Sequence, residues 1–394
     1  AVHAGAEVDV HEDEVDARRA GRDGGDGILA GEDVGDLVAL ARQHARFRET
    51  DYRLVLDQEQ PPGPTVFHVQ ISLPAPFDDR HPGRVVKLAL ARASSPLHHG
   101  AMPEATARAM YSDAHLHFLD LEGRDPGFLP RFASGPYLAC AASHDEAEFG
   151  ATLDLIRRAE AGLAAGAAPA VVGGASGLAG RTVLSFGIHP QSAVWKDADF
   201  LARLASEGRI GAIGEAGFDF FGDRPERVRN GENERSQAAV FEFQLGLAEL
   251  RGLPMVLHVR KAMDLVFAYA RRLARLPAVI LHSYSGTARE GADLLARGVP
   301  AYFSFGAAVL NSHKRAIEAC SLLPAERLLS ETDAPWQPPR GAAFCRFEAI
   351  ADIVAGMARL RGVDPERLGA ALEANFRAAY GLPASPGAPQ ARQA

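Results

Sequence analysis

Apolar and polar residues alternate in two distinct patterns between residues 110 and 383. Short apolar runs of strand length alternate with longer stretches that are apolar on one face, as is typical of strands and amphipathic helices. We predict strands at Tyr111–His117, Tyr137–Ala142, Thr182–His189, Ile210–Glu215, Met255–Val259, Ala278–Ser283, Ala301–Phe305 and Leu328–Asp333. We predict helices at Asp145–Ala165, Phe200–Glu207, Ser236–Arg251, Ala262–Arg275, Thr287–Arg297, Lys314–Leu322, Glu348–Arg361 and Pro365–Tyr380. This alternation favours an α/β fold, a TIM-like (β/α)8 barrel, with a doubly wound open sheet as the alternative.

Residues 1–109 do not share this pattern. Apart from short stretches at Val34–Ala45 and Val66–Leu73, their apolar positions follow no helical or strand period, and prolines and glycines are scattered among them. We interpret the segment as an N-terminal extension that is irregular or non-native, because Met110 would be a natural initiator directly before the first predicted strand. An accessory domain is the alternative. Residues 384–394 are small and polar and predict a flexible tail behind the barrel of residues 110–383.

Composition places the chain among globular proteins. Its 394 residues are 47% hydrophobic and 23% charged, which is enough for a large core and excludes a disordered protein. No run of about 18 apolar residues could cross a membrane, and the acidic N-terminus does not resemble a secretory signal. The cysteines Cys140, Cys320 and Cys345 are too few and too scattered for a disulfide framework, so we expect a protein of the reducing cytoplasm.

The net charge of −8 gives no sign of bulk attraction to nucleic acid or to a membrane surface. Residues 1–109 contain 12 of the 42 basic and 18 of the 50 acidic residues, which leaves a net charge of −2 on the rest. A nearly neutral barrel is therefore expected to contact a nucleic acid through a local surface rather than an extended basic track.

Histidines and carboxylates stand where several predicted strands end. They are His115 and His117 on the first strand, Glu215 on the fourth, His258 on the fifth, His282 on the sixth and Asp333 on the eighth. The carboxyl ends of barrel strands converge on the face where active sites lie. Each residue alone has an ordinary structural explanation, but four imidazoles and two carboxylates in one mouth are enough to hold two divalent ions such as Mg, Zn or Mn.

Six motifs in this order resemble the TatD family of metal-dependent deoxyribonucleases, members of the amidohydrolase-like barrel superfamily. The motifs are Asp113-Ala-His-Leu-His117, Gly187-Ile-His-Pro190, Gly214-Glu-Ala-Gly-Phe-Asp219, His258-Val-Arg260, His282-Ser-Tyr-Ser-Gly286 and Glu331-Thr-Asp-Ala-Pro335. Gln237–Leu245 and Asn375-Phe376 are also similar to this family. The resemblance spans residues 111–383 and includes none of residues 1–109.

The resemblance implies a nuclease with two divalent metal ions. It implies that one ion is held by His115, His117 and Asp333 and the other by His258 and His282, with Glu215 bridging the two. Metal binding lowers the pKa of water from about 15.7 toward 7. Asp333 and Glu215 are therefore the catalytic candidates, with Asp333 placed to orient the attacking water and to take its proton.

Further residues near the strand ends are candidates for supporting roles. We expect His189 and Arg260 to contact the substrate phosphate, although His189 could instead hold the loop before Pro190 and Arg260 could pair with a helix carboxylate. The candidates for hydrogen bonds that fix the imidazole tautomers are Asp113, Asp219 and Glu331. For Asp113 and Glu331, strand-end capping or an ordinary ion pair is the alternative.

Two further segments resemble functional elements, but we assign neither of them a role in the reaction. Gly222–Gln237 mixes arginines with carboxylates; it could form a substrate-gripping rim, but we interpret this balanced run as a solvated loop. Val171–Gly180 resembles the glycine-rich turn of a dinucleotide-binding fold, which must open a helix. Here a predicted strand follows, so we expect a flexible lead-in to that strand.

We predict a monomeric, metal-dependent deoxyribonuclease that acts on nucleic acid, with DNA favoured over RNA, and that binds no membrane. One alternative is a metal-dependent ester or amide hydrolase such as an aminoacyl-tRNA deacylase. Relatives with C–N bond chemistry commonly carry a carbamylated lysine on the fourth strand, where this chain has Glu215. A nucleic-acid-binding relative without activity is a second alternative, and the presence of all six ligands argues against it.

Overall fold

The computed structural model describes residues 111–166 and 178–384, together with four strands before them; side chains are described at 111–162 and 178–384. The chain divides into an N-terminal unit and a larger unit that contains the barrel. Among the helices so described, none is both long and apolar enough to span a bilayer.

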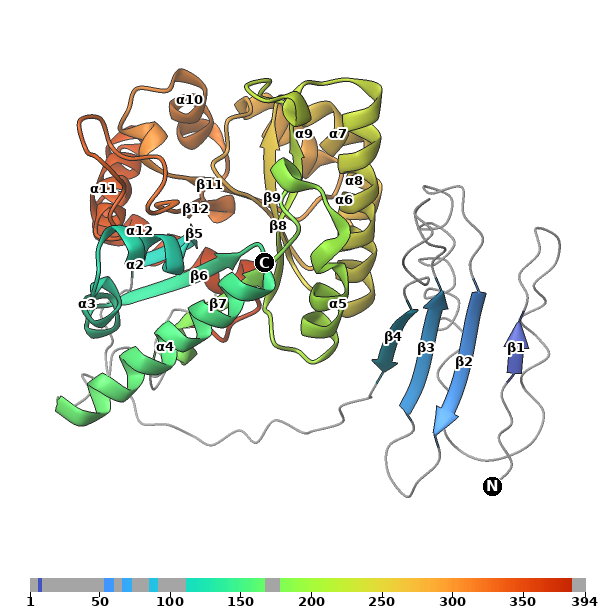
Figure 1. Ribbon diagram of the computed structural model, residues 1–394. Coiled ribbons are helices and arrows are strands. Elements are labelled where there is room, and N and C mark those ends of the chain that lie inside the picture. Colours follow the sequence, from blue (N-terminus) through green and yellow to red (C-terminus); the bar gives the residue numbers. More distant parts are fainter. Residues whose placement is uncertain are drawn as a thin grey trace. The chain divides into compact units, whose positions relative to one another are not determined.

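Eight parallel strands follow one another around the larger unit in chain order (Figure 1). They are β5 (Tyr111–Leu116), β6 (Tyr137–Ser143), β7 (Thr182–Phe186), β8 (Ala212–Asp219), β9 (Met255–Arg260), β10 (Val279–Leu281), β11 (Ala301–Phe305) and β12 (Leu328–Ser330). The last strand returns to the first, because the Asp333 amide donates to the His115 carbonyl at 2.9 Å and the His117 amide donates to the Ala334 carbonyl at 2.8 Å. The predicted (β/α)8 barrel is therefore confirmed over the open sheet.

Helices cover the outside of the strands (Figure 1). They are α2 (Phe118–Arg124), α3 (Phe128–Ser134), α4 (Glu146–Gly166), α5 (Ala198–Ser206), α6 (Gly231–Arg251), α7 (Met263–Ala268), α8 (Ala270–Leu273), α9 (Ala288–Ala296), α10 (Lys314–Leu322), α11 (Ala349–Arg361) and α12 (Pro365–Ala379). The predicted helix at Ala262–Arg275 divides into α7 and α8, and the short helices α2 and α3 were not predicted.

Helix α6 begins at Gly231, within the segment Gly222–Gln237, so the interpretation of this segment as a solvated loop is wrong from Gly231 onward. The Asn230 side chain accepts hydrogen bonds from the amides of Glu232 and Asn233 and so caps the helix. Arg227, from the same segment, is buried and lies against Asp219 and Asp223. The residues before Gly231 therefore form a mostly exposed connection in which Arg227 is buried, and those from Gly231 onward begin α6.

The end of the barrel away from the strand carboxyl ends is closed by α12. Phe376 and Tyr380 pack in one core cluster with small residues of the strands, including Ala114 and Ala212. The Tyr380 hydroxyl donates to the Ala114 carbonyl at 2.6 Å, and the Asn375 amide donates to the carbonyls of Ala325 and Leu328, both at 2.8 Å. This end is filled and tied together, which leaves the opposite mouth for function.

Two glycines of β8 allow the close approach that positions the mouth. A Cβ on Gly217, whose φ is +134°, would lie 2.2 Å from the His258 carbonyl oxygen, and a Cβ on Gly214 would lie 2.5 Å from the Val256 carbonyl oxygen. Both contacts are with the backbone of β9, which cannot move aside cheaply. Glycine at these positions therefore sets the distance between Glu215 on β8 and His258 on β9.

Gly217→Ala is expected to destabilise the barrel by at least about 1–3 kcal/mol, the cost of a strained backbone conformation, with the steric clash in addition. Urea denaturation measures this free energy of unfolding. Gly208→Ala is the matched control, because Gly208 also has a positive φ, +64°, but a Cβ on it would meet nothing within 4 Å. Equal losses in the two variants would show that the contact with β9 does not matter.

The N-terminal unit contains a four-stranded antiparallel sheet in the order β1 (Ala6–Val8), β2 (Arg53–Glu59), β3 (Val66–Ser72) and β4 (Val85–Leu90). These strands are regular structure where we expected an irregular extension, and β3 coincides with the periodic stretch Val66–Leu73. Val34–Ala45 and the predicted tail beyond Ala384 lie outside the described residues. The boundary of the extension at residue 109 stays a prediction.

Candidate metal centre

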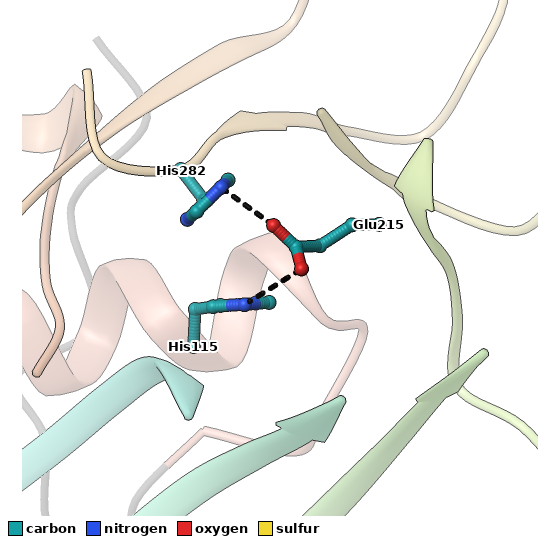
Figure 2. A group of neighbouring side chains, drawn as sticks. All are labelled: His115, Glu215 and His282. Carbon is teal, nitrogen blue, oxygen red and sulfur yellow. Dashed lines mark ion pairs between the residues drawn. The ribbon is translucent and has the colours of Figure 1, made fainter. Parts of the chain in front are cut away.

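The polar residues at the strand ends come together in one buried cluster. Glu215, His258 and His115 lie within β8, β9 and β5, while His282 and Asp333 lie just beyond the ends of β10 and β12. Figure 2 shows the Glu215 carboxylate between His115 and His282, with one oxygen directed to each ring. His117 completes the predicted set of six, and all but the partly exposed His258 are buried.

Each oxygen of Glu215 faces its own group of imidazoles. Oε1 lies 2.7 Å from Nε2 of His282 and 3.3 Å from Nδ1 of His258. Oε2 lies 3.5 Å from Nε2 of His115 and 3.8 Å from Nε2 of His117. One carboxylate therefore separates two pairs of imidazoles, which is the arrangement expected of a bridging ligand.

Asp333 faces only one of these pairs. Its Oδ1 lies 3.4 Å from Nε2 of His117 and 3.8 Å from Nε2 of His115. Its Oδ2 accepts a hydrogen bond of 2.6 Å from the Gln337 side-chain amide. Asp333 and Gln337 both have positive φ, 53° and 49°, an uncommon conformation outside glycine that is concentrated at functional sites.

The two carboxyl groups remain ionised in this buried cluster. Burial alone would raise the pKa of Glu215, but the surrounding imidazoles, His115 and His282 above all, hold it well below its usual value. The pKa of Asp333 is likewise lowered, because its hydrogen bond with His117 and its interactions with the His282 and His115 rings together outweigh the effect of burial. Both side chains are therefore ready to act as anionic ligands.

The partners of the outer ring nitrogens indicate which nitrogen faces the cluster. His258 has Nε2 3.0 Å from Oδ2 of Asp219, so Nε2 carries the proton and Nδ1 presents its lone pair to Glu215 and His282. Nδ1 of His282 lies 3.7 Å from Oε1 of Glu331, which leaves Nε2 for the cluster. Two of the three candidate supporting carboxylates, Asp219 and Glu331, thus face imidazoles.

Asp113 does not have this role. Its carboxylate accepts hydrogen bonds from the backbone amides of His115 and Thr332 and from the Thr332 hydroxyl, and it contacts no imidazole. The alternative for this residue, capping at the strand end, is the arrangement found. Asp113 holds β5 against the segment after β12 and acts on the site only through the backbone.

The donor set fits divalent cations. Nε2 of His115 lies 3.2 Å from Nε2 of His117, and Nδ1 of His258 lies 3.2 Å from Nε2 of His282. Ring nitrogens that face each other beside ionised carboxylates are satisfied by a cation that accepts all the lone pairs. His115, His117 and Asp333 form one such group, and His115, His282 and Glu215 form another.

Asp219→Asn is expected to weaken metal binding about 10- to 100-fold, the usual effect of losing such a supporting carboxylate. Asp219 accepts from His258 and Gln191 on Oδ2 and from the Phe221 amide on Oδ1, so an asparagine NH₂ would face a donor on either side. Titration calorimetry with the metal measures the affinity. Asp199→Asn, an exposed site, is the matched control, and an unchanged affinity in Asp219→Asn would contradict the tautomer assigned to His258.

His189 and Arg260, the predicted phosphate contacts, both lie at the mouth. Nδ1 of His189 accepts from the Gln191 amide, and burial lowers the pKa of His189 to about 3, so the ring is neutral with its proton on Nε2. That Nε2–H lies 3.7 Å from Glu215 and can donate to a substrate oxygen. The Arg260 guanidinium lies 4.0 Å from the centre of the Phe221 ring, at the end of β9.

His144 is a site residue that the sequence analysis missed. It directly follows β6, and its Nε2 lies 2.8 Å from Oε2 of Glu215. It also forms a possible ligand group with His117 and Glu148. His144 follows a predicted strand just as the other ligands do, so the same rule could have found it.

The glycine-rich stretch Val171–Gly180 lies outside the described residues up to position 177. From Leu178 the chain forms a short 3₁₀ turn, Ala179–Arg181, and enters β7. It leads into a strand, as we expected.

Comparisons with known proteins identify the relatives of this chain. The profile of the family described as TatD related DNase matches residues 112–381. Proteins described as 3'-5' ssDNA/RNA exonuclease TatD from Erwinia billingiae and Cronobacter sakazakii are 35% and 36% identical over 211 and 219 residues, which cover 50% and 51% of this chain and 77% of each relative.

Two solved structures share the fold. A TatD homologue from Escherichia coli K12 has a TM-score of 0.55 at 23% identity, covering 69% of this chain and 98% of the homologue. A hydrolase TatD family protein from Entamoeba histolytica has a TM-score of 0.53 at 17% identity, covering 70% of this chain and 99% of the Entamoeba chain. With the barrel, the buried cluster and the matching profile, the chain belongs to the TatD family of metal-dependent deoxyribonucleases.

Proposed function

We propose that this chain is a metal-dependent nuclease that hydrolyses phosphodiester bonds of single-stranded nucleic acid from the 3' end, with DNA favoured. The observation that carries the proposal is the Glu215 carboxylate, whose two oxygens face separate imidazole pairs. Support also comes from the relatives described as 3'-5' ssDNA/RNA exonucleases.

The proposed ligands divide into two sets that share Glu215. One set is His115, His117 and Asp333, and the other is His258 and His282. Bound there, two divalent ions would supply a lowered pKa for the attacking water and positive charge for the phosphate oxygens. Mg, Zn and Mn all suit imidazole and carboxylate donors to some degree, so metal analysis has to identify the ion.

The side chains of the mouth then position the phosphate and accept the proton of the attacking water. Asp333 takes the proton of the attacking water on Oδ1, while the Gln337 amide on Oδ2 holds the carboxylate in orientation. The Nε2–H of His189 donates to a nonbridging phosphate oxygen, and Arg260 provides a charge beside it. The alternatives from the sequence, an ester or amide hydrolase and an inactive relative, are not favoured.

The test is a substrate panel with metal-free protein to which Mg²⁺, Mn²⁺ or Zn²⁺ is added back. We expect metal-dependent shortening of a 5'-labelled single-stranded DNA one nucleotide at a time from its 3' end, and two bound ions per chain by elemental analysis. Faster turnover of an aminoacyl ester would overturn the phosphodiester assignment. Internal cleavage fragments would overturn the exonuclease direction.

We also propose that the protein acts as a monomer in the reducing cytoplasm and binds no membrane. Cys140, Cys320 and Cys345 are buried free thiols, which suits that compartment. Light scattering of the purified protein tests the oligomeric state.

A further inference from the structure

Exposed large hydrophobic side chains gather at the mouth of the barrel. Six such side chains are exposed among the described residues, and four of them lie in segments that follow the carboxyl end of a strand. The four are Val194 after β7, Phe221 and Val228 after β8, and Trp336 after β12. Leu322 and Val363 lie elsewhere, at the end of α10 and between α11 and α12. Apolar residues grouped around a site indicate a binding surface.

Phe221 combines an exposed ring with two cations. The side chain is 43% exposed, the Arg260 guanidinium lies 4.0 Å from the ring centre, and the Lys261 ammonium lies 5.1 Å from it. Lys261 also donates to the Phe221 carbonyl at 2.9 Å. The Phe221 amide donates to Asp219, the carboxylate that holds His258, so the backbone that carries the ring is held beside a proposed metal ligand.

Trp336 has a corresponding position on another loop. Its side chain is 47% exposed, and its backbone amide donates to the Asp333 carbonyl at 2.7 Å. The next residue, Gln337, donates to the Asp333 carboxylate and to the Ser283 hydroxyl, both at 2.6 Å. The backbone of Trp336 is therefore held in place, and the next residue contacts the proposed catalytic carboxylate.

The two rings belong to strands on opposite sides of the barrel. In the order of the sheet, β9, β10 and β11 separate β8 from β12 on one side, and β5, β6 and β7 separate them on the other. A phosphodiester at the centre of the mouth would have one nucleoside toward each ring. Aromatic rings that stack with bases, accompanied by cations for the backbone, are the general means of binding single-stranded nucleic acid.

Resting on the function proposed above, we propose that Phe221 and Trp336 are stacking positions for the nucleobases on either side of the scissile phosphodiester, and that Arg260 and Lys261 bind the backbone next to Phe221. Nucleobases are the occupants that this combination fits, because an aromatic ring flanked by guanidinium and ammonium groups matches the alternation of base and phosphate along a strand. The cations disfavour a purely apolar occupant.

Kinetics on two substrates test the proposal. One is single-stranded DNA, and the other is the same deoxyribose phosphate strand without any bases. Phe221→Ala and Trp336→Ala are each expected to lower kcat/KM on DNA about 10- to 100-fold, mainly through KM, and to leave the base-free strand unaffected. Phe221→Tyr and Trp336→Phe should restore most of the loss. Leu322→Ala, at an exposed site away from the mouth, is the control and should behave as wild type.

Fluorescence provides a measurement that does not depend on hydrolysis. The chain has two tryptophans, so Trp195→Phe leaves Trp336 as the single emitter. A phosphorothioate-linked DNA strand resists cleavage, and in the metal-loaded protein its bases should quench Trp336 while the base-free strand should not.

The outcomes separate this proposal from the function on which it rests. Equal losses on both substrates, no loss on either, or unquenched Trp336 would each overturn base stacking. A wild-type protein that hydrolyses neither strand but shows quenching by bases would overturn the nuclease proposal and support the stacking positions.

Discussion

Replacing Asp333 with asparagine is expected to abolish metal-dependent hydrolysis of single-stranded DNA while the barrel stays folded. The amide cannot take a proton from water and removes one anionic ligand next to His115 and His117. Loss of a general base alone costs about 10²- to 10⁴-fold in rate. Asparagine tolerates the φ of 53° at this position, and its oxygen can still accept from Gln337, so the loop should keep its structure.

Initial rates at saturating metal measure the loss of hydrolysis. The thermal unfolding midpoint of the metal-free protein measures whether the barrel stays folded. Asp199→Asn is the control, because it makes the same chemical change at an exposed aspartate that is not a proposed ligand. A fully active Asp333→Asn enzyme would remove Asp333 from the mechanism. An inactive variant that is also unfolded would show a structural role instead.

Sequence periodicity predicts the barrel well because buried parallel strands are continuous apolar runs. It fails where glycine or proline interrupts the run. Strand β8 continues through Gly217 to Asp219, although the pattern predicts its end at Glu215. Helices α2 and α3 are only seven residues long and surround Asp125-Pro-Gly127, so no helical period is visible in the sequence. Their positions depend on tertiary burial of Phe118, Phe128 and Phe132.

One rule predicts most of the candidate site, namely that polar residues at strand ends meet in the mouth of the barrel. That rule brings together the six proposed ligands, and it also applies to His144, which the family motifs do not contain. The supporting carboxylates are different. The sequence alone does not distinguish the roles of Asp113, Asp219 and Glu331. Only the packed structure shows that Asp219 holds an imidazole whereas Asp113 accepts hydrogen bonds from backbone amides. Such roles depend on partners far away in the chain.

Glu215→Gln is expected to have the second large effect, and it acts first on metal binding. Glu215 is the carboxylate shared by both imidazole pairs, with His282 at 2.7 Å from one oxygen and His144 at 2.8 Å from the other. Glutamine keeps the size but removes the charge, and its NH₂ would face ring nitrogens that are needed as donors to the ion. Loss of several kcal/mol of charge stabilisation corresponds to a fall in activity on the order of 10³-fold or more.

Thermal unfolding with and without metal distinguishes this effect from a direct role in the chemical step. A ligand at 100 times its Kd stabilises the folded state by about 2.7 kcal/mol, so wild type should gain a higher Tm when metal is added. Glu215→Gln should gain little at the same metal concentration, whereas Glu318→Gln, an exposed site on α10, should gain as much as wild type. If Glu215→Gln binds metal as tightly as wild type and is still inactive, the residue acts on the reaction and not as a bridge. Because both outcomes reduce activity, the metal-induced rise in Tm is the measurement that decides between them.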